Sequence, residues 1–229
     1  MIALVDDNGT TYLAEKIPFF VNPDDWRYIL VNEINPLEEG FEVELERFSA
    51  GQYVDARIKD SLDAMFAAAK DAGLNLMVCS SYREIKKQDQ LMDSAIKRYM
   101  RRGMSYTEAF YEAKEQIALT GTSEHHTGLA VDIVGVNHQS LDAAQAETKE
   151  AVWLEEHAAE YGFILRFPED KEKITGIAFE SWHFRYVGEE AASYMKEKNL
   201  CLEEFVALAE LQLGLGIEDR ININMRDDH

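Results

Sequence analysis

The sequence has few cysteines and prolines and no long hydrophobic run. Its 229 residues include two cysteines and four prolines. Cys79 and Cys201 lie far apart, so they form neither a CxxC metal motif nor the dense framework of a small disulfide-rich protein. No segment approaches the roughly 18 apolar residues that a membrane-spanning helix needs. The sequence therefore excludes a disulfide scaffold and predicts no membrane span, while the redox compartment stays open.

Positive charge is also scarce. Acidic residues outnumber basic residues by 43 to 23, which gives a formal net charge of −20. This charge repels phosphate backbones and anionic lipid surfaces, so we expect no nucleic-acid partner. The hydrophobic content of 46% and the few glycines and prolines exclude collagenous, low-complexity and disordered proteins. A chain of this length is expected to fold as a single domain, residues 1–229.

Three segments of this domain differ from its centre. Residues 1–50 mix turn residues with strand-like runs at 28–31 and 41–45, and we interpret them as an arm that wraps a core. Residues 84–120 are charged and helical. This insert is expected to serve for packing, with a lid or a wall of the substrate site as the alternative. Residues 205–229 are interpreted as a C-terminal extension whose polar end is expected to fray.

Asp132 interrupts an apolar strand predicted over residues 128–136. An ionised carboxylate inside such a strand is costly unless a positive group compensates it. His125 lies seven residues earlier, on a loop that can fold back toward the strand. The pair is compatible with a metal site. Taken alone, the pair fits better with an aspartate satisfied by backbone N–H groups or an arginine, beside a surface histidine.

His183 lies between two aromatic residues in a second predicted strand. Its polar ring must be satisfied in the core, and metal coordination is one way to do so. Strand alternation would place Glu180 and His183 on opposite faces. A shared site therefore requires Glu180 to lie in a turn or bulge that enters the strand.

Taken together, His125, Asp132 and His183 form a set of three metal ligands. Three protein ligands leave the fourth position of a tetrahedral zinc ion open, which is typical of catalytic rather than structural zinc sites. Glu180 would then be the base beside the open position.

Three motifs resemble those of the VanY-type D-alanyl-D-alanine carboxypeptidases, which are zinc peptidases, and of the related L,D-carboxypeptidases. The run SEHHTGLAVD at 123–132 resembles their S-x-H-x-x-G-x-A-x-D motif. The run ESWHFRYVG at 180–188 resembles E-P-W-H-F-R-Y-V-G, and SSYR at 80–83 resembles S-G-Y-R. The resemblance extends from about residue 28 to residue 204 and implies one Zn²⁺ per chain, bound by His125, Asp132 and His183.

The sequence departs from these motifs at three positions. Ser81 replaces the usual glycine, His126 a common glutamine and Ser181 the usual proline. None of these changes removes a ligand or the base. The Ser181 change removes a residue that would stiffen the turn carrying Glu180.

The resemblance also implies roles for residues around the metal. Glu180 would be the general base, and Arg83 would bind either the oxyanion or the terminal carboxylate of the substrate. Gln88 and Ser123 are expected to contact the peptide, and Trp182 to form a wall of the pocket.

The implied fold is α+β, with a small antiparallel sheet that carries the zinc site and helices packed outside it. The implied activity is a D,D-carboxypeptidase that removes the terminal D-alanine from peptidoglycan stem peptides by Glu-activated zinc-bound water. Alternatives are an L,D-carboxypeptidase acting on tetrapeptide stems, an endopeptidase with the same type of site, and a zinc-bound recognition module without turnover. The expected partner is a stem peptide, and the expected location is extracytoplasmic or at the cell envelope. A cytoplasmic location and the oligomeric state stay open.

Overall fold

A four-stranded antiparallel sheet forms the centre of the protein. The computed structural model describes residues 2–5, 11–14, 16–38, 40–114 and 117–214. The strands of the central sheet, in spatial order, are β5 (Leu76–Ser80), β6 (Ala130–Gly135), β8 (His183–Tyr186) and β7 (Phe163–Leu165). Two hairpins accompany it, β1 (Ile2–Val5) with β2 (Thr11–Ala14) and β3 (Leu45–Ser49) with β4 (Gln52–Asp55).

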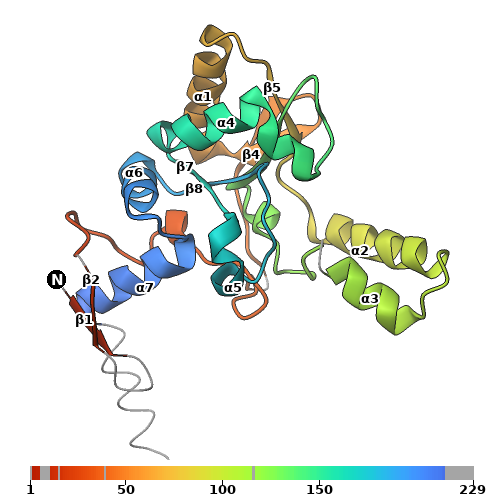
Figure 1. Cartoon of the computed structure of the whole chain (residues 1–229), viewed down its shortest axis with the longest axis horizontal. Helices are drawn as coiled ribbons and strands as arrows, with labels where there is room; N and C mark the ends of the chain where they lie inside the picture. The colour runs from red at the N-terminus through yellow and green to blue at the C-terminus, as the bar shows by residue number, and fades with distance from the viewer. Residues whose placement is uncertain (1, 6–10, 15, 39, 115–116, 215–229) are drawn as a thin grey trace, which may run out of the picture.

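Helices surround this sheet (Figure 1). The α-helices are α1 (Lys59–Asp71), α2 (Ile85–Met100), α3 (Tyr106–Lys114), α4 (Lys149–His157), α5 (Glu172–Thr175), α6 (Glu189–Lys198) and α7 (Leu202–Leu213). Short 3-10 segments include η1 (Trp26–Tyr28), η2 (Ala56–Ile58), η3 (Glu124–Thr127) and η5 (Ala158–Tyr161). None of the described helices combines the length and the apolar character that crossing a bilayer requires. The predicted α+β class with a small antiparallel sheet is confirmed.

One face of the central sheet packs against α1 and α4. Ile133 of β6 and Phe184 of β8 share a buried cluster with Leu62 of α1 and Leu154 of α4. Burial of each large apolar side chain of this kind contributes about 1.5–3 kcal/mol to the free energy of folding. Because successive side chains of a strand point to opposite faces, the neighbouring residues of Ile133 and Phe184 face away from this cluster.

The arm packs against the two C-terminal helices. Tyr28 of η1 contacts Phe205 of α7, with ring centroids 5.3 Å apart, and both belong to a second buried cluster that includes Met195 of α6. The segment expected to be a C-terminal extension therefore begins inside a core helix. Its part from residue 215 onward, including the end expected to fray, lies outside the described residues.

Two strand predictions in the arm are wrong. Residues 28–31 form the end of η1 and irregular chain, and of residues 41–45 only Leu45 is in a strand. The carbonyl oxygens of Arg27 and Ile29 accept hydrogen bonds from Nη2 of Arg185, at 3.0 and 2.9 Å. The Arg185 side chain of β8 thus occupies these carbonyl oxygens. In a strand they would accept hydrogen bonds from the backbone of a neighbouring strand.

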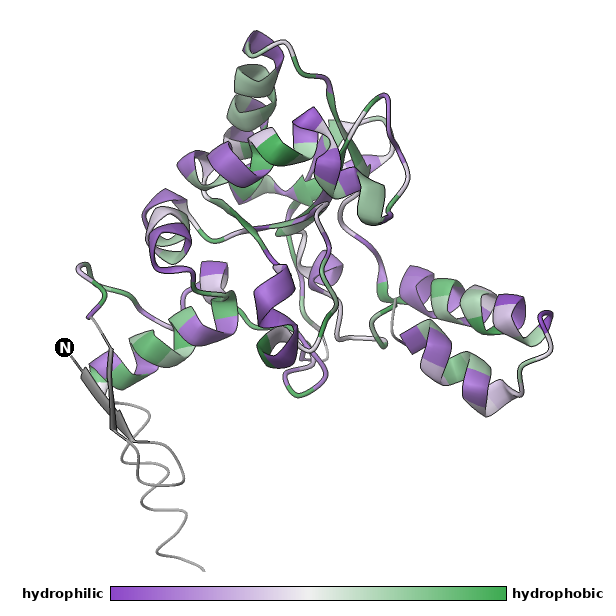
Figure 2. Cartoon of the chain, viewed as in Figure 1, coloured by the Kyte–Doolittle hydropathy of each residue, from purple (hydrophilic) through white to green (hydrophobic). Residues whose placement is uncertain are grey.

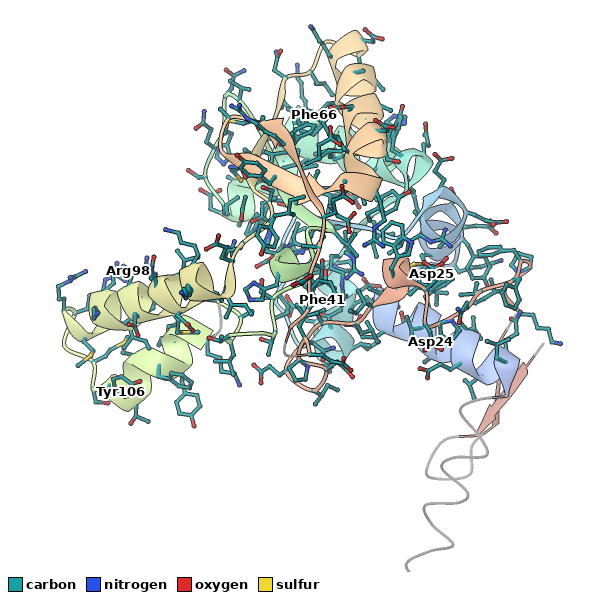
Figure 3. All side chains as sticks on the ribbon, turned by 180° about the vertical axis from the view of Figure 1, so that it is seen from behind. Asp24, Asp25, Phe41, Phe66, Arg98 and Tyr106 are labelled. Carbon is teal, nitrogen blue, oxygen red and sulfur yellow. The ribbon has the colours of Figure 1, made fainter. Side chains whose placement is uncertain are left out.

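The insert at residues 84–120 contains the helical hairpin α2–α3. It projects from the rest of the molecule (Figure 1), and Arg98 and Tyr106 lie on it in the view from behind (Figure 3). Hydrophobic and hydrophilic residues alternate along both helices (Figure 2). Ile96 and Tyr99 of α2 form a small core of their own with Ala109 of α3. The hairpin therefore has a core of its own, and Gln88 near the start of α2 joins it to Arg83 after β5.

Candidate metal centre and active site

Two neighbouring strands and the loop before β6 bring three candidate ligands together. Asp132 of β6 and His183 of β8 are directly opposed in the antiparallel register. His125 lies on η3, which leads into β6. All three side chains are buried, and their ligand atoms lie within 4.8 Å of one another. The fold thus unites the three residues that the sequence analysis selected.

Gly128 determines how the loop carrying His125 enters β6. It ends η3 in the left-handed conformation, with φ +72°. A Cβ atom at this position would lie 2.7 Å from the backbone N of Asp55, and that N–H donates to the Gly128 carbonyl at 3.0 Å. Only glycine fits both the conformation and the close approach.

Each imidazole of the cluster turns one nitrogen toward Asp132. Nε2 of His125 lies 3.3 Å from Oδ2 of Asp132, and Nδ1 of His183 lies 3.2 Å from Oδ1. The other nitrogen of His125, Nδ1, lies 2.9 Å from the Ser81 carbonyl oxygen and donates to it when Nε2 is a ligand. Oδ1 of Asp132 is buried and meets no hydrogen-bond partner among the described residues. Two imidazole nitrogens and an unsatisfied carboxylate oxygen fit the ligand preference of Zn²⁺.

The charges of the cluster favour a cation. Burial alone would raise the pKa of Asp132, but the His125 and His183 imidazoles hold it below its usual range. Burial lowers the pKa of His125, which keeps this imidazole neutral, as a metal ligand must be. Burial opposes charge on His183 too, yet the Asp132 and Glu124 carboxylates raise its pKa to about 9. The imidazole of His183 therefore releases a proton when its nitrogen binds a metal.

Glu180 lies just before the turn that enters β8. Its carbonyl oxygen accepts the backbone N–H of His183 at 3.2 Å, and its Oε2 lies 3.5 Å from Nδ1 of the same residue. The geometric requirement derived from strand alternation is therefore met. Burial raises the pKa of Glu180 to about 7, and Asp132 adds to this effect while His183 and Arg83 oppose it. A carboxyl group with such a pKa can both accept and return a proton near neutral pH.

Arg83 follows β5 and is held by two side chains. Its Nη1 donates to Oε1 of Gln88 at 2.8 Å, and its Nη2 donates to Oγ of Ser80 at 2.7 Å. Nε2 of Gln88 in turn donates to the Ala118 carbonyl at 2.6 Å. Both ends of the buried Gln88 amide are thus engaged. The structure shows that Gln88 fixes Arg83, and the contact of Gln88 with the substrate stays a prediction.

The remaining predicted residues flank the ligands. Ser123 is buried directly before η3, and its carbonyl accepts the His126 N–H at 3.1 Å. Trp182 is half-buried, and its carbonyl accepts the Ile133 N–H at 2.9 Å, which ties the turn after Glu180 to β6. His126 is not part of the metal cluster. Its Nδ1 lies 2.6 Å from the Arg83 carbonyl oxygen.

Comparison with known proteins agrees with this geometry. The sequence profile of the VanY family, described as D-alanyl-D-alanine carboxypeptidase, matches residues 51–189. A D-alanyl-D-alanine carboxypeptidase of Enterococcus faecalis (strain ATCC 700802 / V583) is 42% identical over 182 residues, which are 80% of this chain and 66% of that protein. The chain belongs to the VanY family.

Solved structures of similar proteins share the fold. VanYB in complex with D-alanine-D-alanine has a TM-score of 0.73 at 42% identity, covering 80% of this chain and 98% of VanYB. A variant of the D,D-pentapeptidase VanY from the VanB-type resistance cassette, in complex with Zn(II), has a TM-score of 0.72 at 41% identity, covering 80% and 99%. The LD-carboxypeptidase LdcB has a TM-score of 0.65 at 35% identity, covering 77% and 83%. The predictions of a carboxypeptidase family and of a zinc cofactor are confirmed by these findings.

Behind the metal cluster of this VanY-family domain lies a charge network that the sequence analysis missed. Oε1 of Glu124 accepts hydrogen bonds from Nε of Arg166 and Nη1 of Arg185, each at 2.8 Å. Arg166 also makes a two-point contact with Glu203 of α7. Local periodicity gives no signal for partners 42 and 61 residues apart in the chain. Arg185 gave a signal, because it is a charged residue within an otherwise apolar strand, β8, whereas Glu124 and Arg166 lie outside the strands.

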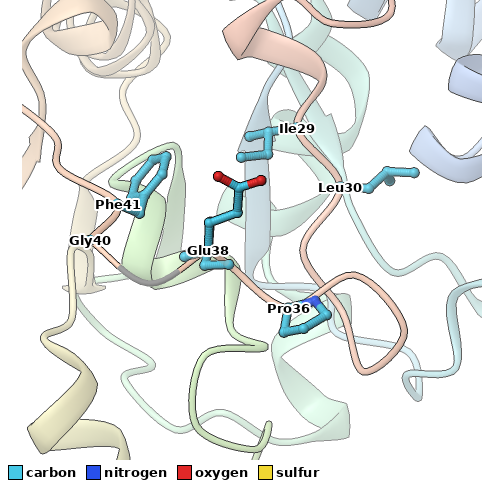
Figure 4. Close-up of a pocket in the computed structure, with 7 residues that line it drawn as sticks. Ile29, Leu30, Pro36, Glu38, Gly40 and Phe41 are labelled. Atoms are coloured by element: carbon cyan, nitrogen blue, oxygen red, sulfur yellow. The ribbon is translucent and has the colours of Figure 1, made fainter.

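A hollow of about 350 Å³ lies along the arm of this VanY-family domain. Its lining includes Ile29, Glu38 and Phe41, and the Glu38 carboxylate is directed between the other two side chains (Figure 4). The arm at this point is joined to the loop before η3, because the Leu37 N–H donates to the Gly121 carbonyl at 2.9 Å. None of the residues that line this hollow belongs to the metal cluster.

Proposed function

We propose that this chain is a zinc-dependent D,D-carboxypeptidase that removes the terminal D-alanine from peptidoglycan stem peptides. The observation that carries the proposal is the buried cluster of His125, Asp132 and His183 with Glu180 at its edge. Support comes from the VanY-family match and from the similarity to VanYB, a protein solved with D-alanine-D-alanine.

Different residues of the chain bind the metal and transfer the proton. His125 and His183 supply neutral nitrogens and Asp132 a carboxylate, so that these three side chains hold the ion. Zn²⁺ in such a site polarises a peptide carbonyl and acidifies water toward a pKa of about 7. Glu180 takes the proton of the attacking water and delivers it to the departing amino group of D-alanine.

Arg83 donates hydrogen bonds to the substrate from a fixed position. Its guanidinium has further N–H groups besides the two donated to Ser80 and Gln88. These donors bind the terminal carboxylate of the peptide or the oxyanion that develops on the scissile carbonyl. Ser123 and Trp182 contact the peptide beside the ligands, and Gln88 keeps Arg83 in place.

Defined stem peptides test this proposal. The purified zinc-loaded protein is incubated with a pentapeptide ending in D-Ala-D-Ala and, separately, with a tetrapeptide ending in L-amino acid-D-Ala, and free D-alanine is measured. We expect release of one D-alanine from the pentapeptide. Release from the tetrapeptide alone would overturn the D,D assignment.

L,D-carboxypeptidase activity is the second candidate, because LdcB shares this fold at 35% identity. Preferred release from the tetrapeptide would favour it, and cleavage inside a cross-linked peptide would favour an endopeptidase. A recognition module without turnover needs no base, so the presence of Glu180 beside His183 argues against that alternative.

The proposed substrate also suggests where the protein acts. Mature peptidoglycan lies outside the cytoplasmic membrane, so we propose an extracytoplasmic or cell-envelope location. Fractionation of cells that express the natural gene, followed by immunoblotting, tests this. Recovery in the cytosol alone would contradict it.

A further inference from the structure

Two buried polar atoms next to the metal cluster face each other without a hydrogen bond. Oε2 of Glu124 and Nε2 of His183 are both buried, and neither has a hydrogen-bond partner among the described residues. They lie 3.6 Å apart. This separation is longer than a hydrogen bond, and a shift of about half an ångström by either side chain would close it.

The chemistry of His183 requires an acceptor at this position. Its Nδ1 faces Asp132 at 3.2 Å, so this nitrogen is the one available to a metal. A neutral imidazole that uses the lone pair of Nδ1 carries its proton on Nε2. A buried N–H needs an acceptor, and Oε2 of Glu124 is the unsatisfied acceptor in front of it.

Glu124 is itself held in place by charge. Its Oε1 accepts from Arg166 and Arg185, both at 2.8 Å, and the side chains of all three residues are 2% exposed or less. Nη2 of Arg185 donates to carbonyls of the arm, and Arg166 contacts Glu203 of α7. With Oε1 occupied by two guanidinium groups, Oε2 stays free for His183.

We propose that Glu124 is a positioning residue of the metal centre, whose Oε2 accepts the Nε2–H of His183 and thereby keeps Nδ1 directed at the metal. This inference rests on the metal site proposed above. His125 is held in the equivalent way by the Ser81 carbonyl. The two imidazoles are thus fixed by different acceptors, one a backbone carbonyl and the other a buried carboxylate.

Glu124→Gln tests the proposal, because an amide cannot accept hydrogen bonds both from the two arginines and from the His183 imidazole. Its oxygen takes the place of Oε1 between the two arginines, which leaves the amide N–H₂ directed at the Nε2–H of His183. Glu203→Gln is the matched control, because it also removes a carboxylate from Arg166 but does not face the imidazole.

Zinc affinity is measured for the wild type and both variants by competition with a chromophoric chelator. Stoichiometric zinc in the wild type tests the metal site separately. We expect Glu124→Gln to weaken zinc binding by about 10–100-fold, as for other groups that orient a metal ligand, and Glu203→Gln to change it far less. An unchanged affinity of Glu124→Gln, or an equal loss in both variants, would overturn the proposal.

A measurement on the wild type covers the case in which Glu124→Gln does not fold. Nitrogen-15 NMR of the histidines in the zinc-loaded protein reports which nitrogen of His183 carries the proton. We expect the proton on Nε2, shifted downfield and slow to exchange with water. A proton on Nδ1, or an Nε2 proton that exchanges as rapidly as that of an exposed histidine, would contradict the inference.

Discussion

Asp132 and His183 occupy directly opposed positions on β6 and β8. Side chains opposed in an antiparallel pair have Cβ atoms about 4.5–5.5 Å apart. Strand pairing therefore fixes the separation of two of the three candidate ligands, and this face of the sheet points away from the cluster formed with α1 and α4. The third ligand depends on the short loop that ends at Gly128.

Removal of one histidine distinguishes the ligand from its neighbour. We expect His125→Ala to lose bound zinc, because one of three ligands is removed, and His126→Ala to retain it. Metal analysis after dialysis, by mass spectrometry, measures the ratio of zinc to protein. Equal zinc content in the two variants would remove His125 from the ligand set, and His183→Ala extends the same comparison to β8.

Glu180→Gln should separate metal binding from turnover. We expect zinc content to stay unchanged and D-alanine release to fall by about 10²–10⁴-fold, because the amide cannot take a proton. Glu169→Gln, at an exposed position, is the control and should be fully active. Wild-type turnover in Glu180→Gln would show that another group acts as the base.

Gln88→Ala tests the support of Arg83. Loss of a hydrogen bond to the guanidinium should lower kcat/KM by about 10-fold, with zinc content unchanged. Gln90→Ala, an exposed residue of the same helix, is the control and should behave as the wild type. If Gln88 only supports packing, thermal stability would fall while kcat/KM per folded molecule stays constant.

Two glycines with positive φ are expected to differ in their tolerance of alanine. The left-handed conformation costs a residue with a Cβ about 1–2 kcal/mol, and this cost applies to Gly128 and Gly103 alike. Only at Gly128 would the new Cβ meet backbone, 2.7 Å from the N of Asp55. Gly128→Ala should therefore lower the free energy of unfolding clearly more than Gly103→Ala. Urea denaturation measures both, and equal losses would contradict the steric argument.

Cys201 should be unreactive in the folded protein. Burial raises the pKa of its thiol to about 12, and only the thiolate reacts with iodoacetamide. Labelling at pH 8 should therefore be slow and should accelerate as pH rises toward 12. Peptide mapping of labelled protein, with and without urea, measures this. Equal labelling of the folded and unfolded protein would show that the thiol is accessible and ionised.

Some structural features were readable from local sequence. The buried strand around Asp132 followed from its apolar run, and the position of Glu180 in a turn followed from the two-residue period of strands. The strand predicted at 28–31 is absent. Backbone carbonyls at this point of the chain accept hydrogen bonds from Arg185, a residue more than 150 positions away. The hydrogen bond of Gln88 was not foreseen for the same reason, since its partner Ala118 lies 30 residues further along the chain.

The sequence by itself indicated the candidate ligands and the base. A charged or imidazole side chain inside an apolar run must be compensated, and the resemblance of the motifs to those of the VanY family implied which residues take part. Only the tertiary structure decided how these side chains face one another. Three features depend on contacts between distant segments: the pairing of β6 with β8, the hydrogen bond between His125 and the Ser81 carbonyl, and the position of Glu124 beside His183. Such contacts leave no periodic pattern in the chain, because they arise only when the sheet forms.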